Sequence, residues 1–427
     1  MRESRVCIIG AGASGIAAAK VLHEKGIPFD GFEKGSSVGG NWRYLNDNGQ
    51  SSAYASLHIN TSKTRMAFSD FPMPDDYPDY PHHAQIARYF DDYVDHFGFR
   101  DQITFRTEVI DVAPAGEGSW DVTLAGGKSR RYGAVLVANG HHWDPKWAHF
   151  PGRFDGLQMH SHDYKTPGVF AGRNVLVIGM GNSGVDIACE SSRVAAHTFL
   201  STRRSAHVIP KYIWGKPVDQ FTTPFTSLLP PAVQALGMQF LLWLTRGPQS
   251  RYGVPVPAHK LHQAHPTISS ELLTLIGHGR IKIKPNVKML AGERVLFEDG
   301  SAERIDCIVH ATGYKVSFPF FKPEVFTVQD NELPLYRWVV PLQHPNLYFI
   351  GFLQPLGAIM PLAELQAKWV AGLLTGACKL PGTGIMQREI IRERERMRRR
   401  YVASTRHTMQ VDFFSYKRQI QRELRRR

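Results

Sequence analysis

The chain has 427 residues, of which 43% are hydrophobic and 21% are charged, and its formal net charge is +13. This length predicts two or more domains, each able to bury a core. The four cysteines are scattered singly with no Cys-x-x-Cys pair, which excludes a disulfide framework and a zinc ribbon. Because the sequence does not open with a charged region, an apolar stretch and a cleavage site, we expect a cytoplasmic protein.

The first predicted element is an apolar strand, Val6 to Ile9, which runs into Gly10-x-Gly12-x-x-Gly15 and a helix-compatible segment. In a dinucleotide-binding fold the first glycine permits a tight turn, the second lets a pyrophosphate approach, and the third lets the helix pack on its strand. The bare N–H groups at the helix start hold the phosphates. The pattern therefore predicts a dinucleotide site.

The residue at the end of the second predicted strand indicates which dinucleotide binds. Glu33 stands there, 33 − 12 = 21 positions after Gly12. An acid at this point accepts hydrogen bonds from ribose hydroxyls and repels a 2′-phosphate. The first loop is thus predicted to bind FAD or NAD.

The same device recurs later in the chain. A small β-meander and an apolar strand are predicted over residues 108–140, and a second apolar strand then runs into Gly179-x-Gly181-x-x-Gly184. The matching strand end has no acid and reads Thr202-Arg203-Arg204. Guanidinium groups there pair with a 2′-phosphate, so the second loop is predicted to bind NADPH. Two surface arginines are the alternative.

The order of elements predicts a nested duplication. After the second loop comes another meander and an apolar strand ending at Thr312-Gly313, and then LYFIGF (347–352) and a helical tail. We predict an α/β fold with two Rossmann-like dinucleotide-binding domains, the NADPH domain being inserted within a discontinuous FAD domain. The FAD domain would comprise 1–167 and, with basic C-terminal helices, 314–427. The NADPH domain would comprise 168–313, with an insertion around 211–267 and a first boundary at the turn 165–168.

Two segments bear on membranes and nucleic acids. The apolar stretch 236–245 is shorter than the roughly 20 residues that span a bilayer, so a buried or groove-lining helix and no transmembrane segment are predicted. The basic runs at 392–400 and 422–427 suit either an anionic partner or a solvated helix. The solvated helix is favoured because no aromatic residues interleave the first run, and no nucleic-acid partner is expected.

The segment before the second loop carries a further motif, Phe154-x-Gly156-x-x-x-His160-x-x-x-Tyr164. It is similar to the fingerprint of the flavin-containing monooxygenases, a family of class B flavoprotein monooxygenases. Further segments are similar to the same family, namely GGNWRY (39–44), NTSK (60–63) and HATGY (310–314). The resemblance therefore spans essentially the whole chain. Tyr164 favours this family over the related Baeyer–Villiger monooxygenases, whose fingerprint usually ends in Trp. No metal is expected at His160 and His162.

The resemblance implies a mechanism. NADPH would reduce FAD, and the reduced flavin would add O2 to form a C4a-hydroperoxyflavin that oxygenates a soft nitrogen or sulfur of a small-molecule substrate. Asn60 would be the catalytic amide beside the flavin, and a helix containing Glu364, Gln366 and Trp369 would cap the isoalloxazine. The expected cofactor-binding residues are Gly10, Gly12, Ala13, Ser14, Gly15, Glu33, Lys34, Gly40, Trp42, His58, Asn60, Val109, Gly179, Gly181, Asn182, Ser183, Gly184, Thr202, Arg203, Arg204, Thr312, Gly313 and Gln354.

Three alternatives to this function stay open. A Baeyer–Villiger enzyme would oxygenate ketones, and an NADPH oxidase would release H2O2 without oxygenating a substrate. A dinucleotide-binding protein could instead use its basic tail to recruit nucleic acid or membrane. The sequence also leaves open a homodimer.

Overall fold

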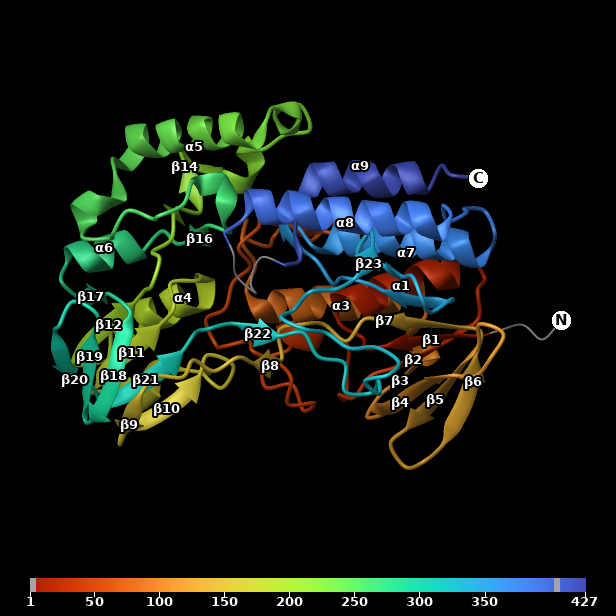
Figure 1. Cartoon of the computed structure of the whole chain (residues 1–427), viewed down its shortest axis with the longest axis horizontal. Helices are drawn as coiled ribbons and strands as arrows, with labels where there is room; N and C mark the ends of the chain where they lie inside the picture. Colours follow the sequence, from red (N-terminus) through yellow and green to blue (C-terminus); the bar gives the residue numbers. More distant parts are fainter. Residues whose placement is uncertain (1–4, 403–407) are drawn as a thin grey trace. The chain divides into compact units, whose positions relative to one another are not determined.

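The computed structural model describes residues 5–402 and 408–427, and the chain divides into two compact units (Figure 1). The first unit comprises residues 1–53, 57–144 and 315–427, and the second comprises 54–56 and 145–314. The chain passes from the first unit to the second within the short strand β8 (Asp144–Pro145), and it returns to the first unit within β22 (Tyr314–Lys315). One unit is therefore inserted in the other, as predicted.

A five-stranded parallel sheet forms the centre of the first unit. Its strands, in spatial order, are β25 (Leu347–Phe349), β7 (Ala134–Val137), β1 (Val6–Ile9), β2 (Phe29–Phe32) and β3 (Ile103–Thr104). β1 and β7 are buried along their whole length, as strands covered on both faces are. Because β25 returns to pair with β7, residues beyond the second unit complete the first sheet.

Helices and a small antiparallel sheet cover this central sheet. The helix α1 (Ala13–Glu24) packs against α3 (His83–Phe97) and α7 (Met360–Leu374), and α7 packs against α9 (Phe413–Glu423). The predicted first meander is β4 (Val109–Pro114), β5 (Trp120–Leu124) and β6 (Ser129–Tyr132), paired antiparallel. The unit also contains α2 (Lys63–Met66), α8 (Thr383–Arg400), β23 (Leu335–Tyr336), β24 (Val340–Pro341), β26 (Gln354–Leu356) and β27 (Gln410–Asp412).

The second unit repeats this plan. Its parallel sheet has the order β10 (Leu157–His160), β21 (Cys307–His310), β11 (Asn174–Ile178), β12 (His197–Ser201) and β17 (Ile281–Lys284), with α4 (Asn182–Ser191) and α6 (Leu272–Gly277) packed on it. The second meander is β18 (Val287–Gly292), β19 (Arg294–Phe297) and β20 (Ala302–Arg304), and β9 (Gly152–Phe154) joins its edge. The α/β class with two Rossmann-like units is thus confirmed.

The first domain boundary differs from the prediction. The units change over between Asp144 and Pro145, before the turn at 165–168 that the sequence indicated. The reason is strand pairing: β10 adds to the edge of the second sheet, with His160 in register with His310. A turn signal in the sequence does not reveal which sheet the strand before it joins.

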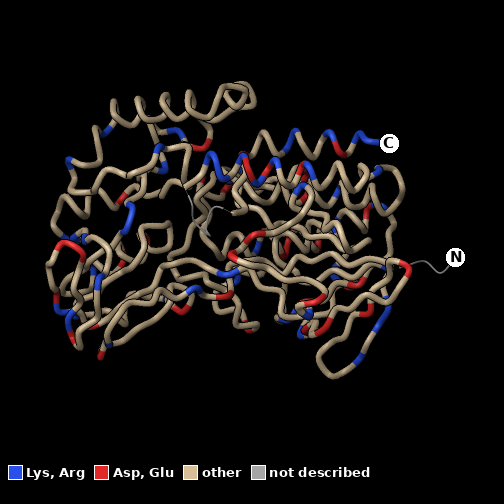
Figure 2. The backbone as a smooth tube through the Cα atoms, viewed as in Figure 1, with Lys and Arg blue, Asp and Glu red and all other residues tan. Residues whose placement is uncertain are grey.

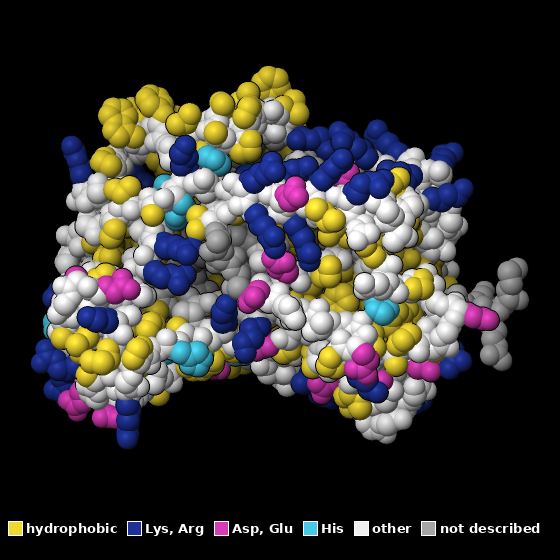
Figure 3. Space-filling model, in the orientation of Figure 1, with side chains coloured by type: hydrophobic (Ala, Val, Ile, Leu, Met, Phe, Trp, Pro, Cys, Tyr) yellow, Lys and Arg dark blue, Asp and Glu magenta, His cyan; other side chains and the backbone are white. Residues whose placement is uncertain are grey.

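The helix α5 (Pro231–Arg246) corrects a second expectation. The segment 236–245 is helical but not buried: Leu236, Phe240 and Trp243 are 64%, 64% and 60% exposed. Figure 3 shows a hydrophobic surface over this helix. The helix is apolar nearly all round, so one face packs through Leu242 and the other is left uncovered. No helix among the described residues is long and apolar enough to cross a membrane.

The predicted insertion around residues 211–267 also contains or adjoins four short strands. These are β13 (Val208–Ile209), β14 (Tyr212–Ile213), β15 (Lys216–Pro217) and β16 (Thr267–Ile268).

The basic tail forms α8, in which acidic and basic residues interleave (Figure 2). Arg396 lies 2.7 Å from Glu393, and Arg392 lies 3.4 Å from Glu389. These i,i+3 pairs offset part of the positive charge along an exposed face. They favour the solvated helix predicted from the sequence.

Candidate active site

The first glycine loop has the geometry that a pyrophosphate requires. Gly10 has φ +99°, and a Cβ there would lie 2.8 Å from the oxygen of Ala138. A Cβ on Gly15 would lie 1.8 Å from the oxygen of Gly10, so only glycine lets α1 approach β1 this closely. No side chain caps α1 at Gly12, and its first turn holds no acid. Its first N–H groups are therefore available to an anion.

Glu33 lies against this loop. Its Oε2 accepts the Ala11 N–H at 2.8 Å, and its Oε1 accepts the Gly35 N–H at 2.8 Å and Asn48 Nδ2 at 3.1 Å. The residue is only 4% exposed. Three hydrogen bonds hold the carboxylate in this buried position. The carboxylate thus stands beside the phosphate loop, where an adenosine ribose would lie.

Other predicted residues divide between this loop and more distant positions. Gly40, in the short 3₁₀ turn Gly40–Trp42, packs on the loop, since its Cβ would lie 2.9 Å from the Cα of Gly12. Lys34 is exposed and pairs with Glu108 at 3.0 Å, and Val109 pairs with Leu124 in the meander. Ala13 and Ser14 lie in the first turn of α1, and Gln354 begins β26. His58 is exposed, and its ring centroid lies 5.0 Å from that of His82. The structure therefore gathers the glycines, Glu33 and Gly40, and leaves Lys34 and Val109 at the meander.

Asn60 lies in the tight loop before α2. The loop is fixed by Lys63, whose Nζ donates to the carbonyl oxygens of Asp75 at 2.8 Å and Tyr77 at 2.5 Å. The Asn60 side chain is half-buried, and its amide has no hydrogen-bond partner in the part of the chain that the structure describes. A rigid loop thus presents an uncharged amide that the protein itself does not use.

The second glycine loop repeats the first. Gly179 has φ +114°, and a Cβ there would lie 2.4 Å from the oxygen of Ala311. A Cβ on Gly184 would lie 2.0 Å from the oxygen of Gly179. The helix α4 begins after Gly181 with no side-chain cap and no acid in its first turn, which also includes Ser183. Asn182 faces back into the unit, where its Oδ1 accepts the Ile268 N–H at 2.9 Å.

The end of β12 carries the opposite charge to the end of β2. Thr202 Oγ1 accepts the Ser205 N–H at 2.9 Å and holds the turn in which Arg203 and Arg204 are exposed. Within the described chain no carboxylate forms an ion pair with Arg203. This guanidinium is therefore available to an external anion.

The strand β21 ends at the predicted Thr312-Gly313 pair. Thr312 Oγ1 donates to the Lys146 carbonyl oxygen, and the Lys146 N–H donates to the Gly313 carbonyl oxygen at 2.9 Å. Gly313 has φ +86°. These contacts bind the chain after β21 to the chain after β8, and they place the pair beside Ala311 at the second glycine loop.

The fingerprint residues are structural within the second unit. Phe154 lies in a core cluster, and a Cβ on Gly156 would lie 2.5 Å from the oxygen of Asp306. His160 is fully buried, burial lowers its pKa to about 4, and its Nδ1 accepts the His162 N–H at 3.1 Å. Tyr164 stacks on Phe170 at 5.6 Å. Residues 5–402 and 408–427 contain no group of three His, Cys, Asp or Glu that could hold a metal ion.

Two acidic residues on α4 were missed by sequence reasoning. Asp186 accepts a 2.5 Å hydrogen bond from the hydroxyl of Tyr54, and Glu190 accepts one from Tyr164. Burial raises the pKa of Asp186 to about 6 and raises the pKa of Glu190 as well. The i,i+4 spacing of the two acids placed them on one helix face, but the sequence did not reveal that tyrosines cover that face.

The helix α7 holds the three residues expected to cap a flavin, all buried. Glu364 accepts hydrogen bonds from the N–H and Oγ of Ser69 at 2.8 and 2.6 Å. Gln366 accepts the Gly351 N–H at 2.8 Å, whereas the Nε1 of the fully buried Trp369 has no partner among the described residues. Glu364 and Gln366 therefore fix loops around the helix.

Two nested Rossmann-like folds with opposite charges at matched strand ends indicate a protein with two dinucleotide sites. The model of the flavin-binding monooxygenase-like family matches residues 3–426. Flavin-containing monooxygenase 5 of Rattus norvegicus is 40% identical over 97% of this chain and 81% of its own length. Dimethylaniline monooxygenase [N-oxide-forming] 2 of the same species is 37% identical over 96% and 81%.

A solved structure, the S-allyl-L-cysteine S-oxygenase of Allium sativum, is 26% identical, with a TM-score of 0.75 over 99% of this chain and 89% of that one. The chain belongs to the flavin-binding monooxygenase-like family. It is an FAD- and NADPH-dependent oxidoreductase, as predicted. The two glycine loops fit such cofactors, because a Cβ on the first or third glycine of either loop would collide with neighbouring backbone.

Proposed function

We propose that this enzyme uses NADPH and O2 to oxygenate a soft nitrogen or sulfur atom of a small molecule. The first loop would hold FAD with Glu33 at the ribose, and the second would hold NADPH with Arg203 and Arg204 at the 2′-phosphate. The observation that carries this assignment is the opposite charge at two matched strand ends, the residues after β2 and after β12. When bound, FAD reduced by NADPH activates O2, so that one oxygen atom enters the substrate and the other leaves as water.

The chain's own residues would orient and protect this chemistry. Asn60 offers an amide that can donate a hydrogen bond to a developing negative oxygen and cannot protonate it. Its loop is held by the Lys63 contacts, so the amide loses little freedom when it binds. The fully buried Glu364 holds the chain at Ser69 through two hydrogen bonds and so fixes the loop that follows α2.

The substrate class is supported by what the relatives are named for. One 37% identical relative is named as an N-oxide-forming dimethylaniline monooxygenase, and the Allium sativum structure is of an S-oxygenase. Amines and thioethers are both soft nucleophiles. The free, buried cysteines fit a reducing compartment, which supports a cytoplasmic location.

Product stoichiometry tests the proposal. The purified holoenzyme would be given NADPH and O2 with N,N-dimethylaniline, methyl phenyl sulfide or cyclohexanone, and product and H2O2 would be counted against NADPH consumed. We expect close to one N-oxide or sulfoxide per NADPH. Conversion of the ketone alone to a lactone would establish the Baeyer–Villiger alternative, and H2O2 with no oxygenated product would establish an oxidase. No NADPH consumption, with salt-sensitive binding to nucleic acid or vesicles, would establish a binding protein.

A further inference from the structure

The C-terminal segment, residues 410–423, packs on the elements that follow β25. Its strand β27 pairs in parallel with β26, with Gln410 in register with Gln354. Its helix α9 packs on α7. The residue after β26, Gly357, lies close to the first residue of α9, Phe413. Gly357 has φ +133°, and a Cβ on it would lie 3.1 Å from the Cβ of Phe413. The last described helix is therefore part of the first unit's core and not an appendage.

A relay of hydrogen bonds links α9 to the first glycine loop. The Tyr416 hydroxyl donates to the Arg337 carbonyl oxygen at 2.6 Å and accepts from Gln366 Nε2 at 2.6 Å. Gln366 Oε1 in turn accepts the Gly351 N–H at 2.8 Å. Gly351 has φ +82°, and a Cβ there would lie 1.9 Å from the Oγ of Ser14, in the first turn of α1. The relay thus fixes the turn that touches the loop.

The direction of every bond in this relay is determined. A backbone N–H can only donate, so Gln366 must point its oxygen at Gly351 and its nitrogen at Tyr416. Burial raises the pKa of Tyr416 above its usual range, so the hydroxyl keeps the proton that it donates. Gln366 and Tyr416 are 0% and 2% exposed, so water cannot replace a lost partner.

We propose that the helix α9 is a working part of the flavin site. Tyr416 is a positioning residue that acts through Gln366 on the turn at Gly351, and through that turn on Ser14 at the first glycine loop. This inference rests on the placement of FAD at the first glycine loop proposed above.

Retention of FAD by the holoenzyme tests the inference without reference to activity. The holoenzyme would be diluted in steps, and the free flavin would be measured from its fluorescence to give the Kd. Because Tyr416→Phe leaves two buried groups unpaired, we expect the Kd to rise about tenfold.

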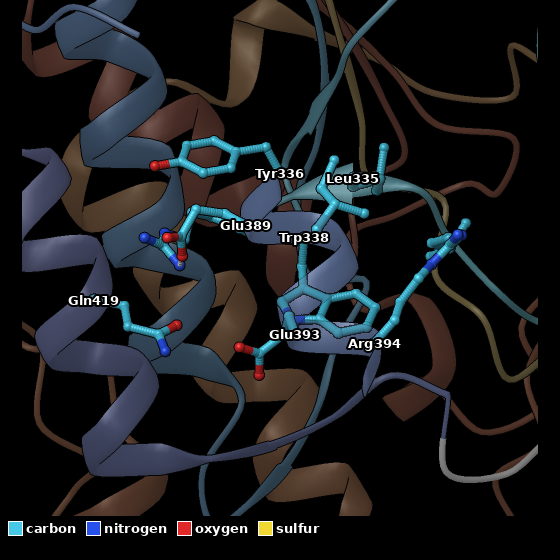
Figure 4. A pocket seen from close by; sticks show the side chains of 10 residues that line it. Leu335, Tyr336, Trp338, Glu389, Glu393, Arg394 and Gln419 are labelled. Atoms are coloured by element: carbon cyan, nitrogen blue, oxygen red, sulfur yellow. Dashed lines mark hydrogen bonds and ion pairs between the residues drawn. The ribbon is translucent and has the colours of Figure 1, made fainter. Parts of the chain in front are cut away.

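The matched control is Tyr336→Phe. The Tyr336 hydroxyl also bonds to α9, at Glu423 with 2.5 Å, and its residue is 1% exposed. The Tyr336 hydroxyl takes no part in the relay, although the next residue, Arg337, supplies its last acceptor, and Tyr336 lines a small pocket with Trp338 and Glu389 (Figure 4). Its variant should keep the wild-type Kd. An equal rise for Tyr336→Phe and Tyr416→Phe would show that α9 docking in general is being measured, and would overturn the relay.

Two further variants separate the possible failures. If Tyr416 acts through Gln366, the effects of Tyr416→Phe and Gln366→Leu on the Kd will be less than additive in the double variant. Additive effects, or a wild-type Kd for Tyr416→Phe, would remove Tyr416 from the site. Glu33→Ala tests the underlying placement, because unchanged FAD retention in that variant would overturn the assignment of the first loop itself.

Discussion

Replacing the third glycine of each loop with alanine should separate the two nucleotide sites. In Gly184→Ala the new Cβ would lie 2.0 Å from the oxygen of Gly179, and in Gly15→Ala it would lie 1.8 Å from the oxygen of Gly10. Real Cβ contacts essentially never fall under 3.0 Å, so each helix must withdraw by about 1 Å from its phosphate loop. Overpacking that shifts backbone costs about 1–3 kcal/mol of stability, and a displaced loop that costs the bound state the same amount lowers nucleotide affinity roughly 5- to 150-fold.

The assay measures both cofactors in each variant. Gly184→Ala should purify with a full complement of flavin by absorbance but show a KM for NADPH raised at least about tenfold. Gly15→Ala should lose FAD. Gly237→Ala is the control, because nothing lies within 4 Å of its Cβ in α5, and alanine there should stabilise the helix by about 0.5–1 kcal/mol. Loss of FAD from Gly184→Ala, with an unchanged KM for NADPH, would refute the assignment of the loops.

Three further changes have defined outcomes. Changing Arg203 and Arg204 together to Ala should raise the KM for NADPH by about 10- to 100-fold and leave the KM for NADH unchanged. The reason is that a charge-assisted hydrogen-bonded pair contributes about 1.5–3 kcal/mol. Equal effects on the two KM values would contradict the role of these arginines. Asn60→Ala should leave the rate of flavin reduction by NADPH unchanged and abolish oxygenated product, and an unchanged product yield would exclude this role. The raised pKa of Asp186, about 6 against 3.8, means that the folded state binds its proton more tightly than the unfolded state, so stability falls as pH rises from about 4 to about 6. Asp186→Asn should therefore raise the free energy of unfolding at pH 7.5 by up to about 3 kcal/mol and have no effect near pH 4, as denaturant unfolding at the two pH values would show.

The parts of the fold that the sequence predicted are those fixed by local periodicity. The two glycine loops and both meanders follow from short apolar strands and turn residues close together in the chain, whereas the return of LYFIGF to the first sheet was predicted from the order of elements along the chain. The steric requirement at Gly15 and Gly184 also follows from spacing alone, because the turn and the helix that it must clear are adjacent in sequence.

The parts that were missed depend on partners far apart in the chain. The first boundary was placed too late because only the pairing of β10 with β21 shows which sheet that strand joins. The hydrophobicity of 236–245 suggested burial, whereas burial depends on whether a partner surface exists. The Tyr54–Asp186 bond and the contact of Gln366 with Tyr416 join residues 132 and 50 positions apart, and nothing local marks either pair.

The duplication explains why so few residues distinguish the two nucleotide sites. Both loops use the same turn, the same uncapped helix start and the same close packing of helix on strand, so neither loop by itself selects its dinucleotide. Under the proposed assignment, selection would fall to the residues just after β2 and β12, where a carboxylate stands in one copy and two guanidinium groups in the other. Because Glu33 is held by three hydrogen bonds inside the protein whereas Arg203 is exposed, we expect the first site to retain its nucleotide and the second to exchange it. An enzyme that oxidises many NADPH molecules on one resident flavin requires that asymmetry.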